Sequence, residues 1–373
     1  MNRRRGFALP LMLAVLAVGS LLLASTFLMA RLEVQSGENG LNAARALEAA
    51  ESGLSEIVAW WDPVLYNQMA TGETRSIPAR NFYGGGYTGS LTRLSPALFL
   101  VEAGGWYQAR ANLPIARRNL RSIVRLPDHS PIVSAALTVI DSISWDGVSL
   151  VSGSDTIPPG WAGSCVLDSA VAGLVSPPGA LVNVGSCPTC FSGNPPTTLD
   201  STVSLGSLTS FGTSGYSGLA ARAAASPGGI IGTVAPQVGG MPAVCLVSDS
   251  LNWGEPLRSG PFTACGGYHP VIHAPGDLSV TGGRGQGTLL VDGDLELGGG
   301  FEFTGVVIVL GTVRNGPGGG SVVGAVLART VSLNGSLPGS PLRIHYSACV
   351  LPNTTRGSSQ AIPLPYRSWA QSF

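Results

Sequence analysis

The sequence predicts an α+β protein in which a long N-terminal helix is followed by a small β-sheet and then by a larger, Gly-rich β region. Residues 7–30 form an apolar run, and helical periodicity continues to residue 61. Beyond this point short β-prone segments alternate with Gly, Pro, Ser and Asn, and an internal repeat occupies residues 287–335. The length of 373 residues corresponds to roughly two or three structural units.

The composition describes an ordered and weakly charged chain. All 21 basic residues are Arg, and 21 acidic residues balance them to a net charge of zero. Charged residues make up 11% of the chain, which is less than half of the roughly 25% typical of soluble domains. Zero net charge and the lack of a basic patch argue against nucleic acid as a partner. Scarce ionisable groups favour a structural or surface role over hydrolytic catalysis.

The apolar run at residues 7–30 contains no ionisable side chain. As a helix it is roughly 36 Å long, which is enough to span a hydrocarbon core of about 30 Å. Three arginines, Arg3 to Arg5, precede it, so the positive-inside rule predicts a cytoplasmic N-terminus and translocation of everything after Arg31. A secretory signal is the alternative, but it has a shorter apolar core of about 7–15 residues followed by a small-residue cleavage site.

The helix is expected to continue as an amphipathic segment over residues 31–61. One apolar stripe recurs at helical spacing, opposite a polar face rich in Arg and Glu. Pro63 limits any further extension of the helix. The stripe consists of Leu47, Ala50, Leu54, Val58 and Trp61.

Two segments of this helix resemble a known family. The residues Arg-Arg-Arg-Gly6 followed by Phe7-Ala-Leu-Pro-Leu11 resemble the leader and the mature start of type IV prepilins. The segment from Arg45 to Leu54, which reads Arg-Ala-Leu-Glu-Ala-Ala-Glu-Ser-Gly-Leu, resembles the A-x-x-A-A-E-x-G-L signature of PilX-like minor pilins. The resemblance covers the chain as far as the end of the expected helix.

The resemblance implies how the chain is processed. Residues 1–6 would be a leader peptide that a prepilin peptidase removes after Gly6 on the cytoplasmic side, and Phe7 would then become the N-methylated first residue. The implied product is a non-enzymatic minor pilin. It would start as a single-pass protein of the inner membrane and join other pilin subunits in a type IV pilus or a related secretion filament, reaching the periplasm or the cell surface. An ordinary membrane anchor with an incidental Gly6 is the alternative.

Leu11 is the fifth residue of the implied mature chain. Most major pilins carry Glu at this position, and in the family that Glu neutralises the N-terminal amine of the neighbouring subunit during assembly. A residue other than Glu resembles the minor pilins and pseudopilins that lie at a filament tip. The resemblance therefore implies a role for this chain at the tip or in initiation.

Residues 62–126 are expected to form a small pilin-like β-sheet that packs on the amphipathic half of the helix. Three segments have the composition of strands, and Gly clusters mark the connections between them. The strand segments are Tyr87–Leu94, Ala97–Glu102 and Trp106–Leu113, and the connections are Gly84–Gly86 and Gly104–Gly105.

Residues 127–373 are expected to form a Gly/Pro-rich, β-rich head. Within the repeat, Gly287, Gly305 and Gly324 start three similar segments whose glycines are 18 and 19 residues apart. A second set of equivalent positions consists of Leu295, Val313 and Val331. Coils of this length are typical of a β-solenoid, in which each coil exposes an apolar stripe that only a neighbouring coil can cover. A β-sandwich is the alternative, because period-2 alternation alone does not separate the two.

Six cysteines follow the membrane segment, and an even number in a translocated region predicts structural disulfides. Cys245 and Cys265 enclose a Gly/Pro-rich loop and form the natural local pair. Cys187-Pro-Thr-Cys190 has the spacing of a redox motif, but no thioredoxin-like pattern surrounds it and no second C-x-x-C completes a zinc site. The disulfide candidates, whose connectivity the sequence leaves open, are Cys165, Cys187, Cys190, Cys245, Cys265 and Cys349.

No catalytic, cofactor or metal site is expected. His269 and His273 are four residues apart, but Pro270 excludes the helix that would bring them onto one face. Asp292 and Asp294 fit the chemistry of a turn. The alternative functions are a membrane-anchored β-helix enzyme acting on polysaccharide, which would need acids clustered with a basic residue on one face, and a cell-surface adhesin. A surface or glycan target stays open.

Overall fold

The chain folds into two compact units, one of which is inserted into the other. The computed structural model describes residues 8–109, 115–127, 131–145, 148–163, 165–183, 187, 189–212, 215–258, 260–333, 340–357, 359–364 and 369–372. The first unit comprises Met1–Trp60, Thr71–Val124 and Pro363–Phe373, and the second comprises Trp61–Ala70 and Arg125–Ile362.

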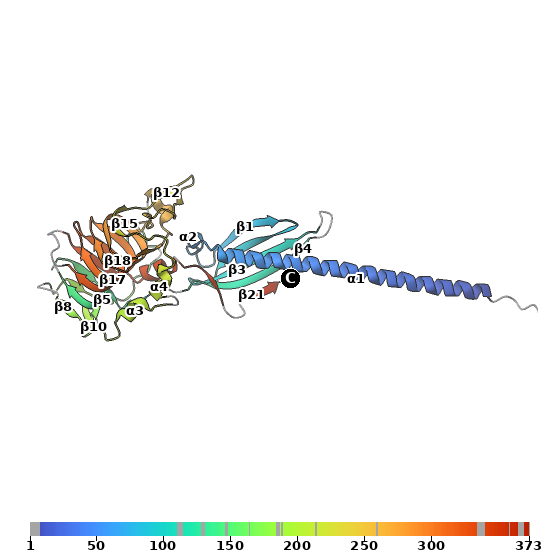
Figure 1. Ribbon diagram of the computed structural model, residues 1–373, viewed down its shortest axis with the longest axis horizontal. Coiled ribbons are helices and arrows are strands. Elements are labelled where there is room, and N and C mark those ends of the chain that lie inside the picture. Colours follow the sequence, from blue (N-terminus) through green and yellow to red (C-terminus); the bar gives the residue numbers. More distant parts are fainter. Residues whose placement is uncertain are drawn as a thin grey trace, which may run out of the picture. The chain divides into compact units, whose positions relative to one another are not determined.

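The first unit combines one long helix with a sheet (Figure 1). Its elements are α1 (Ala8–Ala59), β1 (Thr74–Phe82), β2 (Gly85–Arg93), β3 (Leu98–Tyr107), β4 (Ala116–Arg125), β20 (Ile362–Pro363) and β21 (Trp369–Ser372). The strand order is β1-β2-β3-β4-β20, and β21 also pairs with β4. Although β21 falls within the expected head, it runs antiparallel to β4 with Ala370 opposite Arg121. The end of the chain therefore completes the first sheet.

Helix α1 confirms the expectation of a long apolar helix before a mostly β region. It runs without a break for 52 residues. The next helix, α2 (Pro63–Tyr66), starts at Pro63, and the side chain of Asp62 accepts hydrogen bonds from the backbone N–H groups of Val64 and Leu65.

The glycines of the first sheet occupy two different settings. Gly84 follows β1 in a tight turn with φ of +73°, as a connection requires. Gly104 and Gly105, expected at a connection, instead lie inside β3, which runs through to Tyr107 as one strand. Glycine at position 105 has a steric reason: the α1 backbone packs against β3 there, and no side chain would fit.

The second unit is built on a 13-stranded sheet whose pairings are all parallel in the residues described. The strands are β5 (Ala135–Ser144), β6 (Leu150–Ser152), β7 (Ala172–Ser176), β8 (Leu181–Asn183), β9 (Phe191–Ser192), β10 (Thr197–Leu199), β11 (Gly229–Val234), β14 (Val271–Ala274), β15 (Leu278–Val291), β16 (Leu295–Leu297), β17 (Phe301–Asn315), β18 (Gly320–Ser332) and β19 (Leu342–Tyr346). The remaining elements are α3 (Leu205–Thr209), α4 (Gly215–Ala220), an antiparallel hairpin of β12 (Val238–Gly239) and β13 (Val244–Cys245), a 3₁₀ helix (Gly260–Cys265) and α5 (Val350–Gly357).

The sequence repeat lies in register on neighbouring strands. Gly287 on β15 pairs with Gly305 on β17, and Gly305 pairs in turn with Gly324 on β18. The second set of equivalent positions is aligned in the same way, with Leu295 opposite Val313 and Val313 opposite Val331. Each repeat therefore hydrogen-bonds to the next one through its backbone.

Glycine is required at this position of the repeat because neighbouring backbones approach too closely for a side chain. A Cβ atom on Gly305 would lie 1.9 Å from the carbonyl oxygen of Gly287, and one on Gly324 would lie 2.0 Å from that of Gly305. Both glycines also have positive φ angles, of +157° and +140°. Backbone atoms cannot swing away as a flexible side chain can, so any larger residue would separate the strands.

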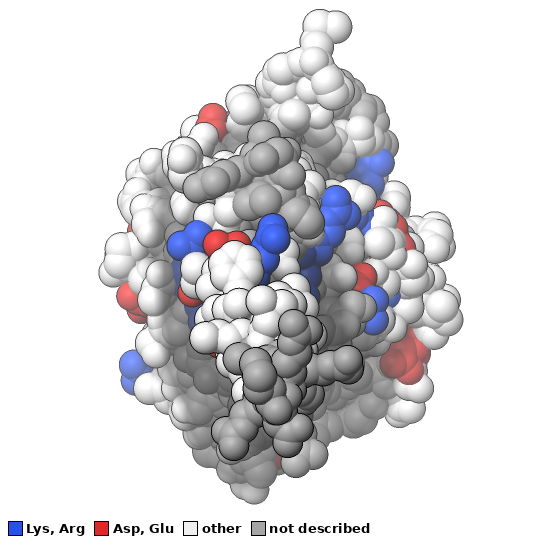
Figure 2. Space-filling model, turned by 90° about the vertical axis from the view of Figure 1, so that its right-hand side faces the viewer, with Lys and Arg blue, Asp and Glu red and all other residues white. Residues whose placement is uncertain are grey.

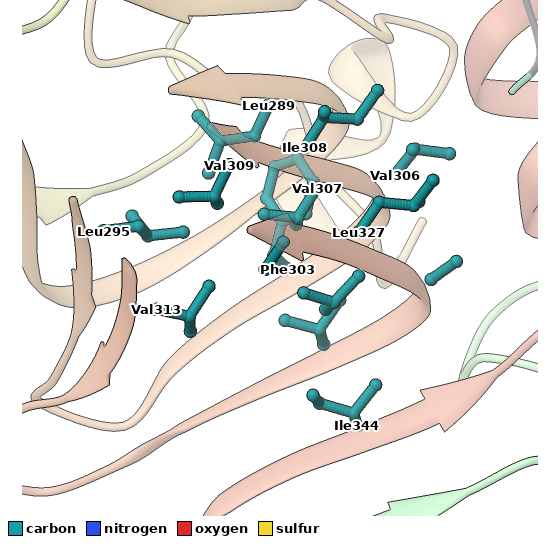
Figure 3. Close-up of a cluster of buried hydrophobic side chains, with 14 of the residues drawn as sticks. Leu289, Leu295, Phe303, Val306, Val307, Ile308, Val309, Val313, Leu327 and Ile344 are labelled. Atoms are coloured by element: carbon teal, nitrogen blue, oxygen red, sulfur yellow. The ribbon is translucent and has the colours of Figure 1, made fainter. Parts of the chain in front are cut away.

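The core of the second unit explains its continuous apolar runs. Val306 to Val309 on β17 and Ala325 to Ala328 on β18 are buried at every position, so both faces of these strands are covered. Helices α3 and α5 contact β17, and aliphatic side chains of successive strands meet in the core (Figure 3). Strands buried on both faces have near-continuous apolar sequences and do not alternate.

The chain enters this sheet in its middle. Strand β5, the first after the crossing from the first unit, pairs with β18, with Leu137 opposite Val326. From β5 the sheet continues through β7 to β10, while on the other side of β18 it continues through β17, β16 and β15 to β11. The exit strand β19 also pairs with β18. The chain therefore enters and leaves the sheet on strands that share one neighbour.

Three disulfides link the six cysteines. Cys245 pairs with Cys265 and Cys187 with Cys190. Cys165 pairs with Cys349 across 184 positions of sequence. This long-range bond joins the segment that follows β6 to the start of α5, so it ties the incoming part of the second unit to its outgoing part.

Breaking the Cys165–Cys349 bond should free chain that it otherwise locks. The disulfide closes a loop that spans 184 residues. A force applied between the two termini is transmitted through this bond, so the residues inside the loop are not stretched. In Cys165→Ser/Cys349→Ser, with the other disulfides closed, complete unfolding should extend the chain by roughly 550 Å more, at about 3.4 Å per residue. Optical-tweezers stretching of the full chain in detergent, held at both termini, measures this length. Equal extensions for the wild type and the variant would contradict the bond.

Candidate membrane and assembly helix

Helix α1 has an N-terminal half whose large apolar side chains are exposed. The most apolar 18-residue stretch of α1 contains no buried residue. In the described part of the chain, α1 is the one helix that is long and apolar enough to cross a membrane. The hydroxyls of Ser20, Ser25 and Thr26 each donate a hydrogen bond to a backbone carbonyl oxygen one turn earlier. The polar atoms of these side chains are thus satisfied within the helix, and the outer surface of α1 up to residue 30 is mainly hydrocarbon.

The expected processing residues lie at and before the start of this half. Gly6 and Phe7 fall outside the described residues. Leu11 lies one turn into the helix with 57% of its surface exposed. Its aliphatic side chain offers no acceptor to an amine.

The C-terminal half of α1 packs on the first sheet through small residues. Ala46 and Ala50 are fully buried, and a Cβ atom on Gly105 of β3 would lie 2.2 Å from the Ala46 carbonyl oxygen and 2.4 Å from the Ala50 nitrogen. Gly53, one turn further on, lies against the ring of Tyr87, where a Cβ atom would approach within 2.7 Å. Helix backbone and strand backbone therefore touch directly.

This packing gives the alanine and glycine positions of the A-x-x-A-A-E-x-G-L segment a physical role. Ala46, Ala49, Ala50 and Gly53 are the buried residues of that segment, while Glu51 is exposed. The buried stripe is thus made of small residues and continues to Ile57. It is rotated from the expected stripe, because Leu47, Leu54 and Val58 are only half-buried. Bulkier side chains at the contact would hold the helix off the sheet.

Polar contacts fix the helix on the sheet beside this stripe. The hydroxyl of Tyr87 donates to Glu56 at 2.6 Å, and Glu56 also forms an ion pair with Arg80 on β1. Arg45 donates to the hydroxyl of Tyr107, and its guanidinium lies 4.9 Å from the centre of that ring. These contacts set the rotation of α1 about its own axis.

A groove remains open between α1 and β4. It has a volume of about 580 Å³, and its walls are mainly apolar. Leu54 and Val58 from the helix face Leu120 of the sheet, with Pro363 at the edge. Leu54 and Val58, two of the three half-buried members of the expected stripe, therefore line this groove.

Several charged side chains of the described residues form ion pairs with a side chain of opposite charge. In the second unit Arg284 pairs with the fully buried Glu255 at 2.9 Å, Arg314 with Asp294 at 2.7 Å, and Arg329 with Asp141 at 2.6 Å. On the face drawn in Figure 2, Arg and acidic side chains are interspersed among neutral ones.

The turn carboxylates are held by structural hydrogen bonds. Asp292 accepts from the Tyr216 hydroxyl at 2.7 Å and lies 3.1 Å from Nε2 of His273. Burial, followed by the bond to Asp292, raises the pKa of Tyr216. Asp294 accepts from the backbone N–H of Thr312 at 2.7 Å on the next strand. No group of three or more His, Cys, Asp or Glu side chains able to hold a metal ion occurs among the described residues.

The two histidines considered as a pair lie in different surroundings. His269 is buried, with its ring 5.7 Å from that of Trp161 in an edge contact, and Gly357 packs on its other side. Burial and the nearby Arg258 lower the pKa of His269 to about 3, so it is neutral at physiological pH. His273 instead contacts Asp292.

Comparison with known proteins gives a structural likeness but no sequence match. No protein-family model and no curated protein matches the chain. Among solved structures, the crystal structure of the competence-associated pilin ComZ from Thermus thermophilus is similar, at 12% sequence identity. The alignment covers 89% of this chain and 97% of that one, with a TM-score of 0.26.

The contact between α1 and β3 should make Gly105 intolerant of even one methyl group. Gly105→Ala places a Cβ against helix backbone and should destabilise the docked helix by about 1–3 kcal/mol. Gly104→Ala is the matched control, since its Cβ would meet only the side chains of Asn119 and Thr88. Hydrogen exchange followed by mass spectrometry should show faster exchange over residues 46–58 in the first variant only. Equal protection in both variants would rule out the close contact.

Proposed function

We propose that this chain is a non-enzymatic, PilX-like minor pilin subunit that is cleaved after Gly6 and enters a type IV pilus or a related secretion filament. The single observation that supports this best is the division of α1. One half offers an exposed apolar surface, while the other docks on a sheet through the alanines and glycine of the pilin-like signature. A helix of this kind can leave a bilayer and pack against equivalent helices without changing its own fold.

The apolar half of α1 would serve in two environments. Before assembly it spans the inner membrane with the N-terminus in the cytoplasm, where the prepilin peptidase and the N-methylation of Phe7 act. After assembly the same side chains pack against the helices of neighbouring subunits. Lipid chains and aliphatic side chains are similarly apolar, so the exchange is driven by close packing and involves little change in hydration.

We infer that the second unit is a β-solenoid that forms the exposed head. Parallel pairing throughout and repeats in register at 18 and 19 residues support this interpretation. A β-sandwich is built from antiparallel sheets, so it accounts less well for the same strands.

A polysaccharide-acting enzyme is less well supported as the function. Asp292 and Asp294 lie beside basic groups, but both already accept hydrogen bonds that hold neighbouring strands or helices. A cell-surface adhesin without a filament differs from the proposal in that it would not assemble with other pilin subunits.

Substituting Gly6 should block maturation. In prepilins the peptidase cuts directly after this glycine, and a larger side chain obstructs the cut, so Gly6→Val should accumulate as the full-length, membrane-retained precursor. Ala8→Val, two residues beyond the cut, is the control and should be processed. N-terminal mass spectrometry distinguishes the products. If Phe7 is still the first residue of the Gly6→Val protein, the prepilin proposal is wrong.

Leu11 should confine the subunit to a filament end. A carboxylate within a bilayer costs about 2.5–3.5 kcal/mol on insertion scales and persists where it has a partner. A subunit with Leu at this position cannot neutralise the amine of a subunit above it, so it should be placed first, with nothing above. Deleting the gene should therefore reduce the number of filaments far more than their length.

Immunogold labelling provides the direct measurement of position. Wild-type protein should be labelled at filament ends, and Leu11→Glu should spread the label along the shaft. Wild-type label along the whole shaft would contradict the tip assignment, as would filaments that the deletion merely shortens.

A further inference from the structure

The hairpin formed by β12 and β13 projects from the second unit (Figure 1). It lies in one of the long parts of this unit without charge, since residues 223–248 contain no Asp, Glu, Arg or Lys. The same stretch contains no Trp, Tyr or Phe. Neither the pilin-like helix nor the repeat of the second unit accounts for this segment.

The base of the hairpin is held firmly. Cys245 on β13 is bonded to Cys265, and both pack with Tyr268 and Val238. The amide of Asn252 donates to the carbonyl oxygens of Gln237 and Leu246, at 3.1 and 2.9 Å. The two strands pair at Val238 with Cys245 and at Gly239 with Val244. The backbone of the hairpin is therefore fixed independently of what its outer side chains contact.

The outer side chains of the hairpin are apolar and exposed. Met241 at the turn is 100% exposed, Val244 is 60% exposed and Leu246 is 43% exposed. Val247 next to them is also exposed, whereas Val238 and Cys245 face the base. A rigid hairpin that exposes several large apolar side chains to water indicates a surface that a binding partner covers when the protein functions.

We propose that this hairpin, Val238 to Val247, inserts into the surface of a lipid bilayer. The hairpin is convex, so it fits a partner that can deform around it, as a lipid bilayer can. Protein interfaces rely on Trp, Tyr and Arg at their centres, and residues 223–248 contain none of these. Nucleic acid is disfavoured because it would require basic groups. A lipid surface requires only apolar side chains and no charge to dehydrate.

The hairpin has the properties that shallow insertion requires. At the base of the hairpin the N–H of Leu246 donates to the carbonyl oxygen of Gln237 at 2.9 Å, and Pro242 at the turn has no N–H group to satisfy. Asp249 and Ser250 follow directly and would remain in water, which limits the depth to the boundary between headgroups and acyl chains. Binding should depend little on salt or on lipid charge, because no ion pair contributes to it. This inference is independent of the proposed pilin function.

A flotation assay with the full chain tests the proposal. Helix α1 is first placed in nanodiscs, so that it cannot insert elsewhere, and protein-free vesicles of phosphatidylcholine are then added, with or without phosphatidylglycerol. Wild-type nanodiscs should float with both kinds of vesicle at low and at high salt. Met241→Ser/Leu246→Ser should reduce flotation at least tenfold. Leu181→Ser, which alters a residue that is 75% exposed on β8, is the matched control and should float like the wild type.

Two further measurements keep the outcome decisive. Peptide mapping without reduction must find the Cys245–Cys265 bond in each variant, which shows that the base of the hairpin has formed. Met241→Trp should add a fluorescence component that brominated lipid quenches, relative to the wild type. The proposal is overturned if the wild type stays with the nanodiscs alone, if the double variant floats equally well, or if flotation needs anionic lipid and disappears with salt. Association of the nanodiscs with one another through the hairpin, in place of vesicle binding, would also overturn it.

Discussion

The second unit depends on the close approach of neighbouring backbones at one glycine position of its repeat. At Gly287, Gly305 and Gly324 the chain has a positive φ angle, and the carbonyl oxygen of the preceding strand occupies the space of a side chain. These contacts fix the register, and the register places the apolar residues of β15, β17 and β18 against each other. A slip of one residue would turn each apolar run relative to its neighbours and would also bring a larger residue to the glycine position.

The same backbone pairing allows the second unit to be an insertion. Strands β5 and β19, the first and the last of the sheet in chain order, both pair with β18. The chain can thus enter and leave beside a single strand, and the Cys165–Cys349 bond joins the two segments covalently. The ends of the sheet are left to β10 and β11, which are far from the connections to the first unit in the strand order.

Helix α1 meets two different requirements with two kinds of residue. Large aliphatic side chains cover its first half, where the surrounding medium is apolar in the proposed function. Small residues line the contact in its second half, because the backbone of β3 comes within touching distance at Gly105. The hairpin of the second unit also exposes large apolar side chains, here on β-strands. Met241 and Leu246 lie on a hairpin whose base is closed by the Cys245–Cys265 disulfide.

The sequence by itself determined the elements whose signal is local. The apolar run before Arg31, the helix up to Pro63 and the glycine spacing of the repeat each follow from a period set by helix or strand geometry. Only the tertiary structure decided which residues of α1 touch the sheet, that β21 returns to β4, that β5 joins β18, and that Cys165 bonds Cys349. The strand pairings join residues that are far apart in sequence. They use backbone N–H and C=O groups, which are common to nearly all residues, so the side chains of a strand do not identify its partner strand. The choice among them is made by chain closure and packing of the whole fold.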